Sequence, residues 1–321
     1  FFHAPPATPD SSTSRGLGDV YKRQVDDIPS QEGRIAVVTG ANIGLGLETT
    51  RALAEKGATV VMACRSRSRG EAARRQLLDE GLTGLDLLEM DLADLRSVER
   101  AVALLTDQYG HLDLLLNNAG VMAPPRQLSP QGHELQFAVN HLGHMALTKG
   151  LLPLMAAQTD ARVVTVTSGA QYFGTIRWDD LSWAQGYDRY GAYGQSKLAN
   201  VMFALELHNR LQSENSTVKS LAAHPGIART NLQPAALASG GNRWEALAYR
   251  LMDPLFQSAG MGALPQLHAA TAASAQSGEH YGPSQLGGLR GSPGQCRIAP
   301  TALDPSKRQR LWALSEQLIS A

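Results

Sequence analysis

Short apolar segments alternate with longer segments of helical spacing through most of this 321-residue chain, and this alternation restricts its fold more than any other feature. The apolar segments are rich in Val, Ile and Leu and are expected to be buried strands: 34–39, 58–63, 85–90, 112–116, 162–167 and 218–223. The segments of helical spacing are expected to be helices: 45–56, 70–80, 95–109, 132–157 and 193–212. Strands joined through helices run parallel, which predicts a three-layer α/β domain with helices on both faces of a mainly parallel sheet.

Two parts of the chain differ in composition from the alternating region. Residues 1–24 are rich in Pro, Ser, Thr and Gly, and residues 19–24 resemble a translated sequencing-library adaptor, so we expect an assembly scar or a natural disordered leader. Residues from about 228 to 265 mix Ala, Gly, Pro and aromatic side chains with weak periodicity, and we expect a substrate lid there. The interpretation is a single domain over residues 25–321, in which Pro153 ends or kinks the helix over 132–157.

The charge balance and the cysteine content exclude several classes of protein. The chain has 29 basic and 29 acidic side chains, whereas a nucleic-acid surface needs a basic excess. Its two cysteines, Cys64 and Cys296, are too few for a disulfide scaffold and favour a reducing, cytoplasmic location. No apolar run approaches the ~18 residues that a membrane-spanning helix needs. His141 and His144 lack the cysteines or carboxylates that would complete a site, so no metal is expected.

A glycine-rich turn lies between the first expected strand and the first expected helix. Glycines allow the backbone to turn tightly and to approach a pyrophosphate, while the start of the helix supplies N–H donors and the positive end of its dipole. A purely structural role for the glycines is the alternative, but the position between strand and helix favours a dinucleotide. The expected cofactor contacts in this turn are Gly40, Asn42, Ile43, Gly44 and Gly46.

The residues after the second expected strand indicate which dinucleotide is bound. An acidic residue there would bind the ribose 2′-hydroxyl of NAD, whereas an arginine accommodates the 2′-phosphate of NADP. Residues 63–69 contain no acid and three arginines, so we expect NADP(H) to be preferred over NAD(H), with Arg65 as the main phosphate ligand. A solvated basic loop is the alternative.

Tyr193 and Lys197 are four residues apart on an expected helix and therefore share one face. An ammonium beside a phenol favours the phenolate, so we expect Lys197 to lower the pKa of Tyr193 from its ordinary value of about 10. Such a tyrosine can give a proton to a carbonyl oxygen or take one from an alcohol. Tyr187 and Tyr190 have no lysine four residues later.

With these motifs in order, the sequence resembles the short-chain dehydrogenase/reductase family, from about Gly33 to the C-terminus. The matching motifs are the glycine turn at 39–46, Asp91-Leu92, Asn117-Asn118-Ala119-Gly120, Asn140, Ser168, Tyr193 with Lys197, and Pro225-Gly226 with Thr230. The sequences at 140–144, 196–200 and 224–226 are similar to those of the retinol-dehydrogenase-like subgroup. The resemblance implies a Rossmann-type doubly wound sheet, and a homo-oligomer is possible.

The resemblance also implies a role for each catalytic residue. Tyr193 would be the acid/base, Ser168 would bind the substrate oxygen, Lys197 would also hold the nicotinamide ribose, and Asn140 would anchor a relay water. The alternative for Ser168 is a hydroxyl that caps a turn, and the alternative for Asn140 is a buried amide bonded to the backbone. Thr167 stands where the subgroup usually has another serine.

The implied cofactor contacts extend beyond the glycine turn. Asp91 would meet the adenine, although a helix N-cap is the alternative for a carboxylate in this position. The other implied contacts are Leu92, Asn118, Ala119, Gly120, Pro225, Gly226 and Thr230.

The implied function is hydride transfer between a nicotinamide and a small-molecule carbonyl or alcohol. The stretch between Ser168 and Tyr193 is rich in aromatic residues. Five of them would wall a pocket for a lipophilic aldehyde or ketone, unless they serve only packing: Tyr172, Phe173, Trp178, Trp183 and Tyr187. The alternatives are a non-catalytic NADP(H)-binding sensor or scaffold, and another reaction on the same fold such as epimerisation or dehydration.

Overall fold

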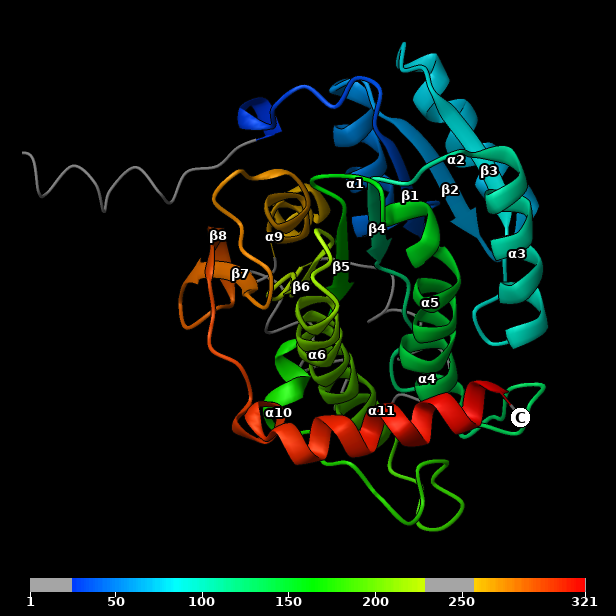
Figure 1. The fold of residues 1–321 in the computed structure, drawn as a ribbon, viewed down its shortest axis with the longest axis vertical. Coiled ribbons are helices and arrows are strands. Elements are labelled where there is room, and N and C mark those ends of the chain that lie inside the picture. The colour runs from blue at the N-terminus through cyan, green and yellow to red at the C-terminus, as the bar shows by residue number, and fades with distance from the viewer. Residues whose placement is uncertain (1–24, 229–256, 321) are drawn as a thin grey trace, which may run out of the picture.

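An eight-stranded sheet forms the centre of the molecule (Figure 1). The structure is a computed structural model and describes residues 25–228 and 257–320. The strands are β1 (Ile35–Thr39), β2 (Thr59–Cys64), β3 (Leu85–Glu89), β4 (Leu114–Asn117), β5 (Arg162–Val166), β6 (Lys219–Ala223), β7 (His280–Gln285) and β8 (Arg290–Gln295). Their order is β3-β2-β1-β4-β5-β6-β7-β8, and β8 alone is antiparallel to its neighbour. The predicted mainly parallel, doubly wound α/β sheet is therefore confirmed.

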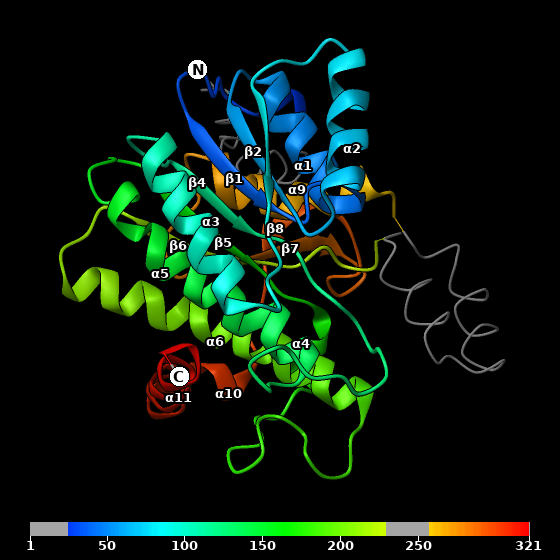
Figure 2. The ribbon, with the colours of Figure 1, turned by 90° about the vertical axis from the view of Figure 1, so that its right-hand side faces the viewer.

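Helices cover both faces of this sheet and complete the three layers. The helices are α1 (Gly44–Glu55), α2 (Arg67–Asp79), α3 (Leu95–Gln108), α4 (Leu135–Phe137), α5 (Gly143–Met155), α6 (Arg189–Ser213), α9 (Ala259–Thr271), α10 (Pro300–Leu303) and α11 (Pro305–Ser320). Figure 2 shows α3, α5 and α6 on one side of the sheet and α1 and α2 on the other, where α9 also packs.

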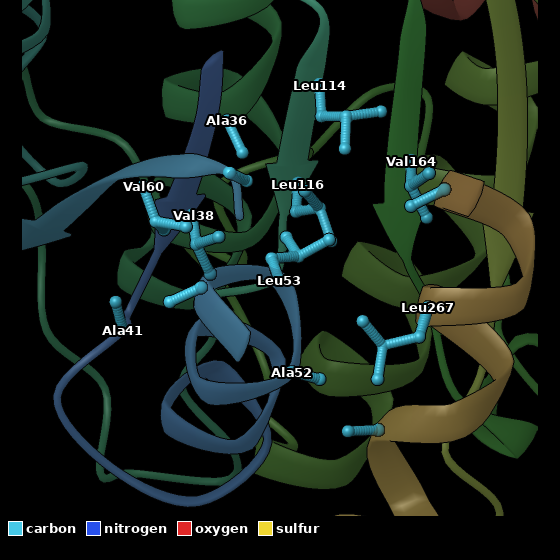
Figure 3. Packing of buried hydrophobic residues seen from close by; sticks show 14 of the residues in the cluster. Ala36, Val38, Ala41, Ala52, Leu53, Val60, Leu114, Leu116, Val164 and Leu267 are labelled. Atoms are coloured by element: carbon cyan, nitrogen blue, oxygen red, sulfur yellow. The ribbon is translucent and has the colours of Figure 1, made fainter. Parts of the chain in front are cut away.

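The central strands are apolar on both faces because both faces are covered. In β1, Ala36 and Val38 point toward α1 and α9, while Val37 points toward the α3 and α5 side. Figure 3 shows Val38 and Leu116 of neighbouring strands beside Leu53 of α1. This packing places the carboxyl ends of β1, β2, β4 and β5 along one edge of the sheet.

The helix predicted over 132–157 is divided by a wider turn. It consists of α4, a π turn over Ala138–Leu142 (η3), and α5. In the π turn the Gly143 N–H donates to the carbonyl of Ala138, five residues back. Pro153 lies in the last turn of α5, and the helix ends two residues later, at Met155. This agrees with the prediction that Pro153 ends or kinks the helix.

The C-terminal part contains elements that the apolar pattern does not indicate. Residues 259–265 of the expected lid belong to α9, which packs against α1 on the sheet, so this part of the lid prediction is wrong. The rest of the lid, 229–256, and the expected leader, 1–24, lie outside the described residues. Helix α11 covers α6, where Trp312 stacks on Phe203 with ring centroids 5.7 Å apart.

Within residues 25–228 and 257–320, none of the helices combines the length and the hydropathy that crossing a membrane requires.

Four buried histidines make the stability of this fold depend on pH. Burial lowers the pKa of His141 and His224 to about 3, and that of His144 and His280 to about 4, from the ordinary 6.5. Below about pH 6 the unfolded chain takes up these protons and the folded chain does not. Each histidine therefore lowers the free energy of unfolding by about 1.4 kcal/mol per pH unit as the pH falls toward 4. We expect the urea midpoint to be much lower at about pH 5 than at about pH 7.

Replacing one of these histidines checks the cause. In His141→Phe one titrating group is gone, so the free energy of unfolding should fall less steeply between about pH 6 and pH 5. A slope equal to that of the natural sequence would show that the histidines do not set the pH dependence.

Candidate active site

A cavity of about 250 Å³ opens at the carboxyl ends of the first strands. Among its lining residues are eleven of the cofactor contacts expected from the sequence: Gly40, Asn42, Ile43, Gly44, Gly46, Arg65, Asp91, Leu92, Asn118, Ala119 and Gly120. Ser66, Val121 and Val139 also line it, and no motif in the sequence indicates them. The alternation of strands and helices thus brings four separate turns to one cavity.

The glycine turn leaves room in this cavity because it has almost no side chains. Gly40 and Gly44 have φ values of +67° and +56°, which favour glycine. A Cβ on Gly46 would lie 2.3 Å from the carbonyl oxygen of Gly40 and 2.7 Å from Asn118 Nδ2. At the start of α1, no side chain caps the first N–H groups. Free N–H groups at a helix start and a glycine cradle fit the pyrophosphate of a dinucleotide.

The loop after β4 is bound directly to the end of β1. The hydroxyl of Thr39 accepts the N–H groups of Asn118 and Ala119, both at 2.9 Å, and Asn118 Nδ2 donates to the Thr39 carbonyl at 2.7 Å. Gln266 of α9 donates to Asn118 Oδ1 at 3.2 Å. Gln266 positions a cofactor-side residue, and it was missed because its contact spans 148 residues of sequence.

The end of β2 presents cations to the cavity. Arg65 and Arg69 line it and are exposed, and neither pairs with a carboxylate within the described residues. Ser66 caps α2 by accepting the N–H of Arg69 at 3.4 Å. The sequence did not indicate Arg69 as a cofactor contact. Its position in the first turn of α2, facing the cavity, depends on the Ser66 cap, which the sequence pattern does not show. Two neighbouring guanidinium groups without a carboxylate partner can form charge-assisted hydrogen bonds with a phosphate monoester.

Asp91 lines the same cavity and does not cap a helix. Its carboxylate accepts the N–H of Ala93 at 2.9 Å within a turn. Asp94 caps α3, by accepting the N–H of Arg96 at 3.2 Å. The helix-cap alternative for Asp91 is therefore wrong.

Tyr193 and Lys197 lie on the buried face of α6, beside Ser168 at the end of β5. The hydroxyl of Ser168 lies near enough to the phenol of Tyr193 to act on its pKa, and Lys197 Nζ lies 5.8 Å from the centre of the Tyr193 ring. Lys197 Nζ also donates to the carbonyl of Val166 at 3.2 Å. A Cβ on Gly120 would lie 3.5 Å from Lys197 Nζ, so the inner end of the cavity reaches the lysine.

Burial gives Tyr193 and Lys197 pKa values that differ from the expectation. Desolvation raises the pKa of Tyr193, and the hydrogen bond from Ser168 only partly offsets this, so the prediction of a lowered pKa is wrong in this structure. Desolvation also lowers the pKa of Lys197 to about 8. Both shifts have the same cause, because a buried site disfavours phenolate and ammonium alike. The arrangement keeps the Tyr193 phenol protonated at neutral pH and able to donate.

Asn140 is held by hydrogen bonds to the backbone and to α6. Its Oδ1 accepts the N–H of Val121 at 2.8 Å, and its Nδ2 donates to the Val121 carbonyl at 3.0 Å and to Ser196 Oγ at 2.9 Å. Ser196 Oγ in turn donates to the Tyr193 carbonyl at 2.8 Å. The structure therefore shows the alternative given above for Asn140, a buried amide bonded to the backbone, and its role at a relay water stays a prediction.

Two hydroxyls at the end of β5 also have structural partners. Ser168 Oγ accepts the N–H of Ala170 at 3.3 Å and so caps the short helix Gly169–Tyr172 (η4), in addition to its contact with Tyr193. Thr167 Oγ1 donates to the carbonyl of Lys197 at 2.7 Å. The threonine that departs from the subgroup pattern thus binds β5 to the helix that holds Lys197.

The expected contacts after β6 lie apart from the cavity. Gly226 has φ +66°, and a Cβ there would lie 2.4 Å from the carbonyl oxygen of Leu289 in the β7–β8 turn. Pro225 accepts from Gln257 Nε2 at 2.7 Å through its carbonyl. Neither residue lines the cavity, and Thr230 lies outside the described residues.

The five aromatic residues that are expected to wall a substrate pocket divide into two groups. Trp178 and Trp183 lie under Arg310 and Arg177, at 4.6 and 4.3 Å from guanidinium carbon to ring centre, and Tyr187 hydrogen-bonds Gln136 and Pro124. Those three residues serve packing.

Tyr172 and Phe173 are 50% and 63% exposed. Phe173 lies against Gly194, beside Tyr193, where a Cβ on the glycine would be 2.9 Å from its ring. The Tyr172 hydroxyl donates to the carbonyl of Arg297 at 2.7 Å, so of the two rings Phe173 is the one that lies exposed beside Tyr193. Within the described ranges, no group of His, Cys, Asp or Glu could hold a metal ion.

The chain is similar to known short-chain dehydrogenases over most of its length. The family model described as short chain dehydrogenase matches residues 34–239. Retinol dehydrogenase 13 of Homo sapiens is 36% identical over 291 residues, covering 89% of this chain and 85% of that protein. A short-chain dehydrogenase/reductase of Armillaria gallica is 38% identical over 315 residues, covering 94% of this chain and 95% of that protein.

Solved structures share the fold. A crystal structure of a protein from Mycobacterium Paratuberculosis is 39% identical with a TM-score of 0.77, covering 93% of this chain and 98% of that chain. The Pseudomonas aeruginosa RhlG/NADP active-site complex is 25% identical with a TM-score of 0.62, covering 78% of this chain and 94% of that chain.

A single added methyl group tests whether the glycine cradle binds the dinucleotide. In Gly46→Ala the Cβ collides with the Gly40 carbonyl, so the turn must open and lose its fit. We expect the Kd for NADPH, measured by fluorescence titration, to rise at least about tenfold. Gly110→Ala is the matched control, because nothing lies within 4 Å of the added Cβ. Equal affinities of the two variants would show that the turn does not bind the dinucleotide.

Proposed function

This chain belongs to the short-chain dehydrogenase family and is retinol-dehydrogenase-like, and on that premise we propose that it reduces a lipophilic aldehyde or ketone with NADPH. Carbonyl–alcohol interconversion with a nicotinamide cofactor follows from the family. The preference for NADP(H), the lipophilic substrate and the roles of individual residues are our proposal. The observation that carries it is the position of Lys197 Nζ beside Gly120, which lines the cavity, with the Tyr193 ring 5.8 Å from that ammonium and Ser168 next to the phenol.

The proposed mechanism assigns one task to each of these residues. A nicotinamide held in the cavity would supply the hydride for the substrate carbon, or accept it in the oxidative direction. The Tyr193 phenol, kept protonated by burial, gives its proton to the substrate oxygen, and it takes the proton back in the oxidative direction. Ser168 Oγ, already beside that phenol, donates to the same oxygen and stabilises its developing charge. Lys197 holds the cofactor ribose beside Gly120 and, when charged, favours the phenolate.

Charge at the outer end of the cavity supports NADP(H). Arg65 and Arg69 are exposed there, unpaired within the described part of the chain, and no acidic side chain follows β2 to bind a ribose hydroxyl. A 2′-phosphate would supply the negative charge with which these two guanidinium groups could pair.

Two exposed aromatic residues support a lipophilic substrate. Phe173 lies against Gly194 of α6, next to the proposed acid, and it and Tyr172 expose ring surface that water solvates poorly. The retinol dehydrogenase names of the relatives point the same way.

Turnover of a carbonyl panel by the natural sequence and by Tyr193→Phe tests the reaction. The panel contains small polar ketones, aromatic aldehydes, steroids and retinal, each with NADPH. We expect the lipophilic members to be reduced best, and Tyr193→Phe to lower kcat by about 10²- to 10⁴-fold, because the variant has no proton to give. Tyr190→Phe is the control, since Tyr190 is on the same helix without a lysine four residues later.

Each departure from this result has a distinct meaning. NADPH binding without turnover of any member would favour the sensor or scaffold alternative. Reduction confined to small polar ketones would overturn the lipophilic substrate. Full activity of Tyr193→Phe would remove the proposed acid.

Substitution of the arginines tests the choice of dinucleotide. In Arg65→Ala, and more so with Arg69→Ala added, the KM for NADPH should rise about tenfold or more while the KM for NADH changes little, because only NADPH has the 2′-phosphate. Arg67→Ala is the control, since Arg67 is exposed on the same turn but does not line the cavity. A parallel rise of both KM values would contradict 2′-phosphate recognition.

A further inference from the structure

His144 joins the turn at the cofactor cavity to the segment that holds Asn140. It lies just after the π turn, at the start of α5, and it is buried. Its Nε2 lies 2.9 Å from Thr39 Oγ1, and its Nδ1 lies 3.0 Å from the carbonyl oxygen of Asn140. No motif in the sequence indicates this role for the histidine.

The partners of the two ring nitrogens determine where the proton is. A carbonyl oxygen only accepts, so Nδ1 of His144 must carry the hydrogen and donate it to Asn140. Both lone pairs of the Thr39 hydroxyl are used by the N–H groups of Asn118 and Ala119, so the hydroxyl must donate. The unprotonated Nε2 of a neutral imidazole accepts that hydrogen.

The neutral form agrees with the surroundings of the ring. Burial lowers the pKa of His144 to about 4, and the charge of nearby Lys197 acts in the same direction. The Thr39 hydroxyl has a second acceptor, the carbonyl of Leu116 at 3.2 Å, but the imidazole is closer. The Nδ1–H tautomer gives both ring nitrogens of His144 a partner of the right kind, an acceptor at Nδ1 and a donor at Nε2.

We propose, resting on the proposed function, that His144 is a positioning residue that holds the Thr39 hydroxyl with Nε2 and the Asn140 carbonyl with Nδ1–H. It thereby sets the relative positions of the cofactor cavity and the proton-transfer site. The imidazole does not line the cavity, so it acts on it through the residues that it holds.

Each of its two bonds positions a different part of the site. On the Thr39 side, the oriented hydroxyl keeps its lone pairs toward the loop at 118–119, which lines the cavity. On the Asn140 side, the held carbonyl fixes a residue that bonds Val121 and Ser196, and Ser196 bonds the turn of α6 that contains Tyr193. Loss of the first bond should affect dinucleotide affinity, and loss of the second should affect the chemical step.

Two amide variants separate the bonds, because an Asn amide reaches the position of Nδ1 and a Gln amide reaches that of Nε2. His144→Asn keeps the bond to Asn140 and loses that to Thr39, so the Kd for NADPH should rise about tenfold with a smaller change in kcat. His144→Gln keeps the bond to Thr39 and loses that to Asn140, so kcat should fall about 10- to 100-fold with a smaller change in Kd. His144→Leu should show both losses.

His141→Leu is the matched control. His141 is a buried histidine in the same segment, but its Nε2 bonds Ser315 of α11 at 2.8 Å, away from the site. We expect kcat and the Kd for NADPH to stay within about twofold in the folded fraction of this variant, which circular dichroism measures. Equal losses of both constants in the Asn and Gln variants, or losses in His141→Leu like those in His144→Leu, would reduce the role of His144 to packing.

The tautomer gives a readout that does not need turnover. Nitrogen-15 NMR of the imidazoles near neutral pH, with His144 assigned from its loss in His144→Gln, should show a protonated Nδ1 and an unprotonated Nε2. An Nε2–H tautomer or a doubly protonated ring would overturn the proposal. If no carbonyl is reduced by the natural sequence, the proposed function fails, while the tautomer and the NADPH affinities of the variants still decide whether His144 holds Thr39.

Discussion

The hydroxyl of Thr39 joins the two loops that form the walls of the cofactor cavity. It stands at the end of β1 and accepts two N–H groups from the loop after β4, and these bonds are possible because the two strands are parallel neighbours whose ends coincide. Asn118 reinforces the junction by donating to the Thr39 carbonyl. The glycines of the turn provide space, but a buried threonine determines how far apart the walls stand. A one-atom change in this side chain would therefore act on the whole cavity.

Burial of α6 determines the protonation of the groups that do the proposed chemistry. The sheet covers one face of this helix and α11 covers another, so Tyr193 and Lys197 are both buried. A site with little water disfavours charge on either group, which raises the pKa of the phenol and lowers that of the amine. The four-residue spacing of Tyr193 and Lys197 predicts a lowered pKa for the phenol. Burial instead raises that pKa, so the phenol stays protonated. The same fold thus keeps the phenol protonated while it weakens the charge of the ammonium beside it.

Apolar periodicity was sufficient for the first six strands and insufficient for the last two. β1 and β6 begin only one residue later than predicted. The agreement is this close because runs of Val, Ile and Leu are typical of strands that are buried on both faces. β7 and β8 contain Gly, Pro, Ser and Gln, and they form because β6 offers an open edge with which β7 pairs. The start of α6 at Arg189 depends on the Asp188 cap, and the π turn interrupts a stretch whose apolar pattern is continuous. Each of these features depends on a particular hydrogen bond, which periodicity does not report.

The sequence by itself determined the order of the elements, the glycine turn, and the face shared by Tyr193 and Lys197. Those follow from local spacing, since residues four apart on a helix are neighbours in any fold. The tertiary structure alone decided that His144 and Gln266 position the site, because their contacts span 105 and 148 residues of sequence. It also decided the direction of the pKa shift of Tyr193. Desolvation is a property of everything packed around a group, so no motif that contains the group can specify it.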